Sequence, residues 1–127
     1  MVMYMEKLGS AYYGKRNLTK GTVLKYLFNV KYSGDPKELV TMEDISKHTG
    51  LSLKYIQHRM NRWAKWNYVL VDYVPGMVKT LFYRIATKGE QFLADAPEPV
   101  LAKYQASIDA AEAKLYKDDG GIKGLFS

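Results

Sequence analysis

The chain has 127 residues, of which 47% are hydrophobic and 25% charged, a composition typical of one soluble domain and not of a disordered chain. It contains no cysteine, which excludes disulfides, thiolate nucleophiles and cysteine-ligated zinc and favours a reducing, cytoplasmic location. No apolar run approaches the roughly 20 residues that span a bilayer, and no leader is evident, so we expect neither membrane insertion nor secretion.

Positive charge is concentrated in the middle of the chain. Residues 51–88 contain seven Lys or Arg and a single Asp, a net charge of +6, whereas residues 1–50 carry +3 and residues 89–127 carry −3. A polyanion is the natural partner of such a segment, because each phosphate that a cation neutralises releases condensed counterions. The alternative interpretation is a solvated basic face that binds nothing.

The N-terminal region, residues 1–18, is expected to form an arm or a short helix that packs on the domain or touches the polyanion. Apolar residues then recur at steps of three and four between Val23 and Phe28, which predicts a helix over residues 20–31 with one apolar face. Pro36 removes a backbone donor and restricts the residue before it, so we expect a loop after this helix.

Two short helices joined by a tight turn follow. Thr41 and Asp44 have the spacing of a capping box, which predicts a helix over residues 42–48. Gly50 suits the left-handed position that ends a helix, and a further helix is predicted directly afterwards, over residues 53–66. Because so little chain separates the two helices, the pair indicates a helix-turn-helix.

The second helix of this pair has two unlike faces. Its inward stripe consists of Leu53, Ile56, Met60 and Trp63, at steps of three, four and three. Polar and basic residues occupy the other side. Ser52 stands at the N-cap position, and Asn67 is expected to end the helix in the left-handed conformation.

A hairpin and a short helix are predicted next. Residues 68–74 and 80–86 are rich in Tyr, Val, Leu and Ile and are separated by a Pro-Gly turn, which favours two paired strands. Thr87 and Glu90 repeat the capping-box spacing and predict a helix that stops before Pro97. The fold class is therefore mainly α-helical with a small β-hairpin.

A C-terminal helix is predicted over residues 98–117. Its apolar positions form a narrow heptad seam of Leu101, Tyr104, Ile108, Ala111 and Leu115, the pattern of a helix that pairs with another helix. We expect a homodimer through this helix; the alternative is that it folds back over the first helix of its own domain. The chain thus divides into an arm or short helix (1–18), a central domain (19–96), a C-terminal helix (97–118) and a flexible tail (119–127).

The order of these elements resembles the winged helix-turn-helix family. Thr49-Gly50-Leu51-Ser52 resembles its turn, Asn67-Tyr68-Val69 its exit into the wing, and Tyr83-Arg84-Ile85 with Lys88-Gly89 its return strand and next helix. The resemblance covers residues 20–93. The C-terminal helix is similar to those of prokaryotic regulators of the multiple-antibiotic-resistance and phenolic-acid-repressor types, which implies dimerisation outside the winged domain.

The resemblance makes the helix over residues 53–66 a candidate to enter the major groove of double-stranded DNA. This groove admits a helix whose side chains meet base edges. We expect Lys54, Tyr55, His58 and Asn61 to face the bases, with Gln57 close to their edge, and Arg62 and Lys65 to hold phosphates. Lys79 is the single basic residue of the wing tip.

Other functions have less support in the sequence. His48 and His58 are the only histidines and lack the spacing of metal ligands, so we expect no metal; His48 is expected to lie near the turn without a special role. No motif of an enzyme or of a cofactor site is present. The sequence predicts a DNA-binding transcriptional regulator; the alternatives are a winged-helix module that binds protein, or a nonspecific architectural DNA binder.

Overall fold

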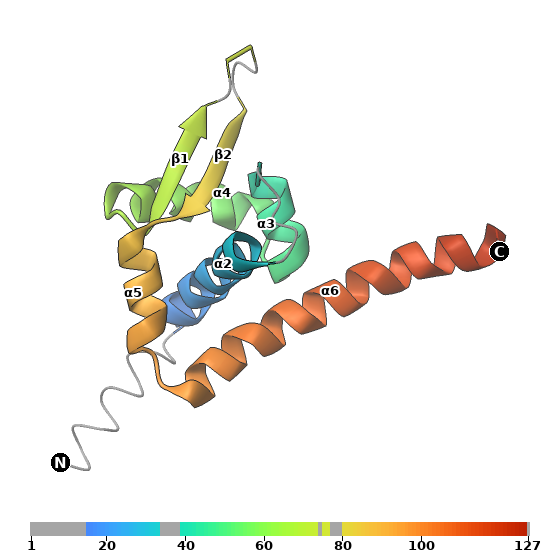
Figure 1. Ribbon diagram of the computed structural model, residues 1–127. Helices are drawn as coiled ribbons and strands as arrows, with labels where there is room; N and C mark the ends of the chain where they lie inside the picture. Colours follow the sequence, from blue (N-terminus) through green and yellow to red (C-terminus); the bar gives the residue numbers. More distant parts are fainter. Residues whose placement is uncertain (1–14, 34–38, 74, 77–79, 127) are drawn as a thin grey trace.

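The computed structural model describes residues 15–33, 39–73, 75–76 and 80–126. These residues form a mainly helical fold with one antiparallel pair of strands, as the sequence predicts (Figure 1). In chain order the elements are α2 (Lys15–Tyr32), α3 (Met42–Thr49), α4 (Leu53–Lys65), β1 (Val69–Tyr73), β2 (Leu81–Ile85), α5 (Thr87–Asp95) and α6 (Glu98–Phe126). None of the described helices is long and apolar enough to cross a membrane.

Helix α2 begins earlier than predicted. It starts at Lys15 and not at residue 20, so residues 15–18, which the sequence placed in an arm or a separate short helix, belong to α2. Leu18 packs against the core, and the Thr22 hydroxyl donates to the Leu18 carbonyl at 2.8 Å. These tertiary and local contacts extend the helix beyond the apolar repeat. The rest of the predicted arm, residues 1–14, lies outside the described residues.

The caps of the helix-turn-helix are confirmed. The Thr41 hydroxyl accepts from the Asp44 N–H at 3.2 Å, and the Asp44 carboxylate accepts from the Thr41 N–H at 3.1 Å, which satisfies two backbone donors at the start of α3. Gly50 ends that helix with φ 76°, a conformation open to glycine at no steric cost. The Ser52 hydroxyl accepts from the Tyr55 N–H at 3.2 Å and so caps α4.

The inward stripe of α4 anchors that helix in the core. Ile56, Met60 and Trp63 are at most 1% exposed. Burying side chains of this size contributes about 1.5–3 kcal/mol each before conformational entropy is subtracted, which holds the opposite, polar face of α4 toward solvent. The buried partners from α2 and α3 include Val23, Leu24, Leu27 and Ile45.

Strands β1 and β2 form the predicted wing, with Val69 opposite Ile85. Asn67 precedes β1 with φ 65°, the left-handed conformation that the sequence predicts. The Tyr83 N–H donates to the Val40 carbonyl at 2.9 Å, which ties β2 to the segment before α3. Helix, helix-turn-helix and hairpin in this order make a winged helix-turn-helix.

The predicted capping box of α5 is wrong. Thr87 is already the first helical residue, and the N-cap is Ala86, which makes no side-chain cap. Ala86 stays extended because its N–H donates to the Tyr68 carbonyl at 3.1 Å, which continues the pairing of the hairpin. The carboxylate of Glu90 instead accepts from two side chains at the end of α2.

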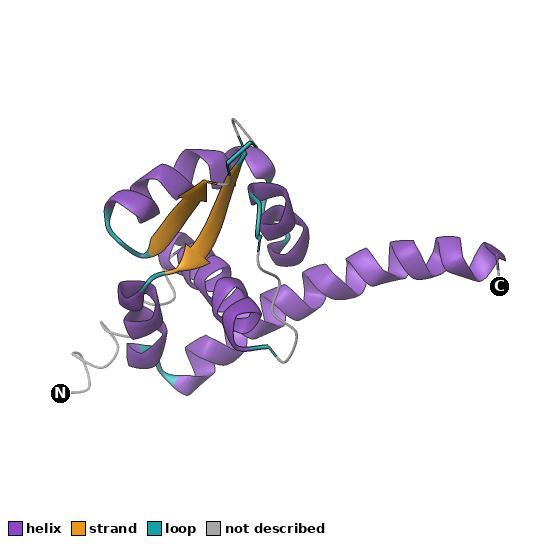
Figure 2. Ribbon diagram, turned by 45° about the horizontal axis from the view of Figure 1, so that its top comes forward, coloured by secondary structure: helices purple, strands orange, loops and turns teal. Residues whose placement is uncertain are grey.

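Helix α6 crosses the helical body and runs out beyond it (Figure 1, Figure 2). Val100, Tyr104 and Ile108 are at most 1% exposed, and α6 contacts α2 and α3. The Tyr104 ring lies directly against Gly21 of α2, where an added Cβ would stand 2.1 Å from the ring. This part of the heptad seam therefore covers the chain's own first helix, which is the alternative that the sequence left open.

The end of α6 also differs from the prediction. The helix continues to Phe126 and does not stop near residue 118, so the predicted flexible tail, residues 119–127, is helical over its described part. Gly120 and Gly121, which follow the predicted end of the helix, lie within α6. Glycine lowers helix stability without forbidding helical dihedral angles, so it is a weak signal for a helix end.

Candidate nucleic-acid interface

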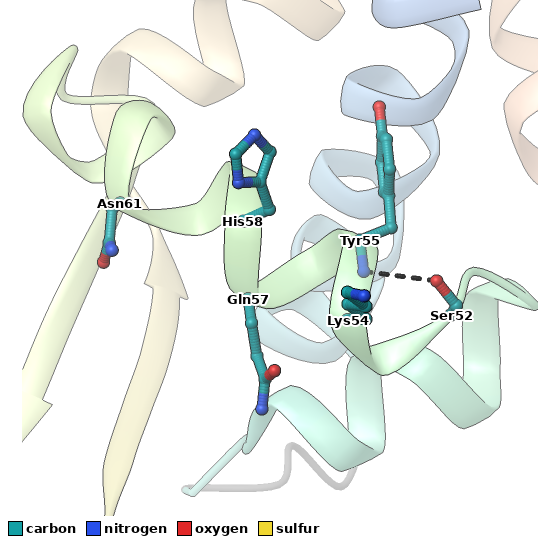
Figure 3. A pocket seen from close by; sticks show the side chains of 6 residues that line it. All are labelled: Ser52, Lys54, Tyr55, Gln57, His58 and Asn61. Atoms are coloured by element: carbon teal, nitrogen blue, oxygen red, sulfur yellow. Dashed lines mark hydrogen bonds between the residues drawn. The ribbon is translucent and has the colours of Figure 1, made fainter.

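The outer face of α4 forms a shallow hollow of about 640 Å³. Its lining consists of Ser52, Lys54, Tyr55, Gln57, His58 and Asn61. All five residues that were predicted to lie at or near the base-facing side are thus on one surface. In Figure 3, Tyr55 and His58 point toward one edge of this surface, and Gln57 points toward its other edge, near the start of α3.

Four of these side chains are exposed and have no polar side-chain partner among the described residues. Lys54, Gln57, His58 and Asn61 are exposed, and within the described residues none of them is hydrogen-bonded or ion-paired to another side chain. Each carries donors that the fold itself does not use. Such a row of free donors on one face of a well-anchored helix is able to recognise polar edges or phosphates.

Tyr55 is placed differently from its neighbours. Its side chain is half-buried, and its hydroxyl forms a 2.7 Å hydrogen bond with the Thr19 hydroxyl of α2. The hydroxyl of Tyr55, a residue that was predicted to face the bases, therefore already has a partner. The bond fixes the N-terminal part of α2 beside α4.

We expect Tyr55→Phe and Thr19→Val each to lower the free energy of unfolding by about 1 kcal/mol, the usual net contribution of a hydrogen bond. In the double variant the loss should be clearly smaller than the sum of the single losses, because both changes remove the same bond. Urea denaturation of the four proteins measures this coupling. Additive losses would contradict the pairing.

The predicted phosphate anchors lie at the C-terminal half of α4. Arg62 and Lys65 are exposed, and neither is ion-paired with a described residue. The sequence interpretation missed Arg59, whose Nε is buried without a hydrogen-bond partner. The third predicted basic residue, Lys79 of the wing tip, lies outside the described residues.

The described part of the wing is electrically balanced. Arg84 donates from Nε and Nη2 to the Asp72 carboxylate at 2.5 and 3.0 Å. This hydrogen-bonded guanidinium lowers the pKa of the Asp72 carboxyl. Leu70 and Tyr73 of the same strand are 41% and 77% exposed. The wing strands therefore present apolar surface and a neutralised arginine, in contrast to α4.

His48 connects the helix-turn-helix to α6, which corrects the expectation that it has no special role. Its Nδ1 lies 3.0 Å from the Glu112 carboxylate, and its ring stacks on Tyr26 of α2 at 5.0 Å and 9°. Glu112 also accepts from the Tyr116 hydroxyl at 3.3 Å. Burial, reinforced by nearby carboxylates, raises the pKa of Tyr26 above its ordinary value.

Metal ligation has no geometric support in the part of the chain that the structure describes, where no three His, Asp or Glu side chains lie close enough to hold an ion. His48 and His58 also serve different surfaces: the first faces α6 and the second lines the hollow on α4. The chemistry of α4 is therefore that of hydrogen bonds and positive charge.

The sequence matches no family model and no curated protein. Two solved structures are similar to the chain. A transcriptional regulator from Thermotoga maritima is 16% identical, with 98% of this chain and 87% of that chain covered and a TM-score of 0.47. A mutant of MepR from S. aureus bound to an oligodeoxyribonucleotide is 13% identical, with 99% and 93% covered and a TM-score of 0.49.

Proposed function

We propose that this protein is a homodimeric transcriptional regulator that binds a specific sequence of double-stranded DNA with α4 in the major groove. The observation that carries the proposal is the outer face of α4, where exposed donors free of partners among the described residues stand on a helix held by three buried side chains. The major groove displays a distinct donor and acceptor pattern for each base pair. A rigid helix with uncommitted polar side chains suits that pattern.

The side chains of α4 divide by their chemistry. Gln57 and Asn61 can each bond an adenine with two hydrogen bonds, and Lys54 can donate to a guanine. His58 can donate to either a base or a phosphate. Arg62 and, one turn along, Lys65 would hold phosphates and set the register of the helix, while Lys79 would reach the backbone from the wing tip.

A titration with duplex DNA at several salt concentrations tests this function. Arg62, Lys65 and Lys79 in each of two protomers predict a slope of about −5.4 in the plot of log affinity against log salt, since each neutralised phosphate contributes about 0.9. Competition by random-sequence duplex then separates a specific regulator from an architectural binder. Absence of binding at low salt would overturn the proposal.

Dimerisation is proposed through the distal part of α6. The seam residues Tyr104 and Ile108 are buried within the chain itself, whereas the helix continues beyond the body (Figure 1) and Tyr116 is 58% exposed. Two copies joined there would present two α4 helices to half-sites about one turn of DNA apart, roughly 34 Å.

Truncation after Glu112 is expected to convert a dimer to a monomer while leaving the fold intact. This end point keeps the buried residues of α6 and the carboxylate that meets His48, whereas truncation at Pro97 would strip the cover from α2. Sedimentation measures the mass, and circular dichroism with thermal unfolding verifies the fold. If the mass does not change, the distal part of α6 is not the interface.

One observation favours a second candidate, a module that binds another protein. Trp66, Leu70 and Tyr73 lie at the end of α4 and along β1 and are 47%, 41% and 77% exposed. Aromatic side chains such as Trp66 and Tyr73 are enriched in protein interfaces relative to the rest of a protein surface. Replacing Trp66 and Tyr73 with Ser should leave DNA affinity unchanged within about threefold (~0.6 kcal/mol) if the regulator proposal holds.

A further inference from the structure

Two lysines converge on one aromatic ring at the edge of α4. The Lys20 ammonium lies 4.3 Å from the centroid of the Tyr68 ring, and the Lys88 ammonium lies 4.6 Å from the same centroid. Lys20 is also 4.6 Å from the centroid of Phe92, whose ring meets that of Tyr68 edge-on. These four residues, from α2, α5 and the turn before β1, are called the Tyr68 cluster below.

The Tyr68 cluster is fixed beside α4. The Tyr68 N–H donates to the carbonyl of Trp63 in α4 at 2.9 Å, and the Tyr68 carbonyl accepts from Ala86 at 3.1 Å. Helix α2, which carries Lys20, is also attached to α4, because the hydroxyl of the adjacent residue Thr19 is hydrogen-bonded to the Tyr55 hydroxyl of α4. The cluster therefore flanks the same helix that carries the hollow.

Neither lysine has an acidic partner among the described residues. This distinguishes them from Lys31 of α2, which pairs with Glu90 at 3.0 Å, and from Arg84, which pairs with Asp72. The two ring distances limit the separation of the ammoniums to about 9 Å. Like charges within this distance repel each other most at low ionic strength, and the negative faces of aromatic rings offset this only in part. An anion bound next to both ammonium groups would lower this repulsion further.

We propose that the Tyr68 cluster is a phosphate-binding site that holds the DNA backbone alongside α4. The inference rests on the proposed function. It adds a second DNA-contacting surface, which lies beside α4 and is separate from the base-facing residues. Successive phosphates of one strand advance about 3.4 Å along the DNA axis, so one or two of them fit the span of the two ammoniums. The ammonium groups already lie next to the Tyr68 and Phe92 rings, and side chains held in this way lose less entropy on binding.

A purely structural role predicts different results from a phosphate site. If the lysines only cover the rings, methionine replaces them well, because it keeps an apolar stem and loses the charge. The experiment compares wild type, Lys20→Met, Lys88→Met and the double variant in the full-length protein. DNA affinity is measured at several salt concentrations, and thermal unfolding reports stability.

The matched control is Lys25→Met. Lys25 lies on α2 with its ammonium 5.0 Å from the Phe28 centroid, and five residues after Lys20 it points about 140° away around the helix. It therefore undergoes the same loss of charge next to a ring, on another face. Lys20→Arg, which keeps the charge, serves as the rescue variant.

We expect the salt slope to become shallower by about 0.9 per lysine and per bound protomer, with Lys25→Met unchanged and Lys20→Arg close to wild type. A steep wild-type slope that stays the same in the double variant would overturn the inference and leave the proposed function standing. Absence of DNA binding by wild type would overturn both.

Inorganic phosphate separates a backbone site from a site for a small anion. We expect millimolar phosphate to shift the nuclear magnetic resonance signals of the Tyr68 ring in wild type and not in the double variant. Phosphate binding combined with an unchanged salt slope would show a small-anion site, and it would contradict a role in holding DNA.

Discussion

Arg62→Glu is expected to lower the affinity for duplex DNA by about 100-fold, or about 2.7 kcal/mol. Arg62 is exposed on α4 and has no ion-pair partner among the described residues. The change removes one phosphate contact and places a carboxylate against the backbone, and like charges brought together at an interface cost several kcal/mol. A titration at fixed salt, with thermal unfolding to verify the fold, measures the loss.

The control for this variant is Lys103→Glu. Lys103 is exposed on α6, and the substitution changes the net charge by the same two units. If both variants lose the same affinity, only the overall charge matters and α4 has no special place. Arg62→Lys should retain most of the binding, since it keeps a positive charge in reach of the same phosphate.

The features of the helix-turn-helix that could be predicted from sequence are local ones. The Thr41–Asp44 box, the left-handed Gly50 and the Ser52 cap each depend on side chains within five residues of one another. The buried stripe of α4 follows from the 3.6-residue period in the same way. Local signals place the outer face of α4, because the face opposite a buried stripe has to be exposed.

The capping box at Thr87 shows where a local signal fails. Its sequence spacing equals that of Thr41 and Asp44, but Ala86 is held extended by its bond to Tyr68, so the helix starts one residue earlier than a Thr87 cap requires. A backbone contact across 18 residues of sequence overrides the propensity of one side chain. Propensity is a weak prior wherever tertiary contacts fix the backbone.

Contacts between segments that lie far apart in the chain could not be predicted from the sequence. Two side-chain contacts, Thr19–Tyr55 and His48–Glu112, join residues that are 36 and 64 positions apart. No sequence pattern around either residue of a pair indicates the other. The heptad seam of α6 likewise predicts that this helix packs against another helix but does not identify that helix. In the structure, Tyr104 and Ile108 are buried within the same chain, and the Tyr104 ring contacts Gly21 of α2.

The contact between α2 and α6 yields the second large expectation: Gly21→Ala should lower the free energy of unfolding by about 2 kcal/mol. At an open helical position the same substitution stabilises by about 1 kcal/mol. Here the new Cβ would stand 2.1–2.5 Å from three atoms of the buried Tyr104 ring. Overpacking of this kind typically costs 1–3 kcal/mol or more, so either the ring or the whole of α6 has to move.

A second substitution, at Tyr104, tests whether the contact between Gly21 and the Tyr104 ring causes this loss of stability. Tyr104→Leu alone should destabilise by leaving a cavity over Gly21, whereas in the Gly21→Ala background the smaller side chain makes room for the methyl group. The double variant is therefore expected to be more stable than the sum of the two losses predicts. Additive losses, or a Gly21→Ala protein as stable as wild type, would show that α6 does not dock on α2 through this ring. Because the proposed dimer interface is the distal part of α6, a protein in which α6 is detached from α2 would no longer hold the two α4 helices at a fixed spacing, and its DNA affinity should fall although no residue of α4 has changed.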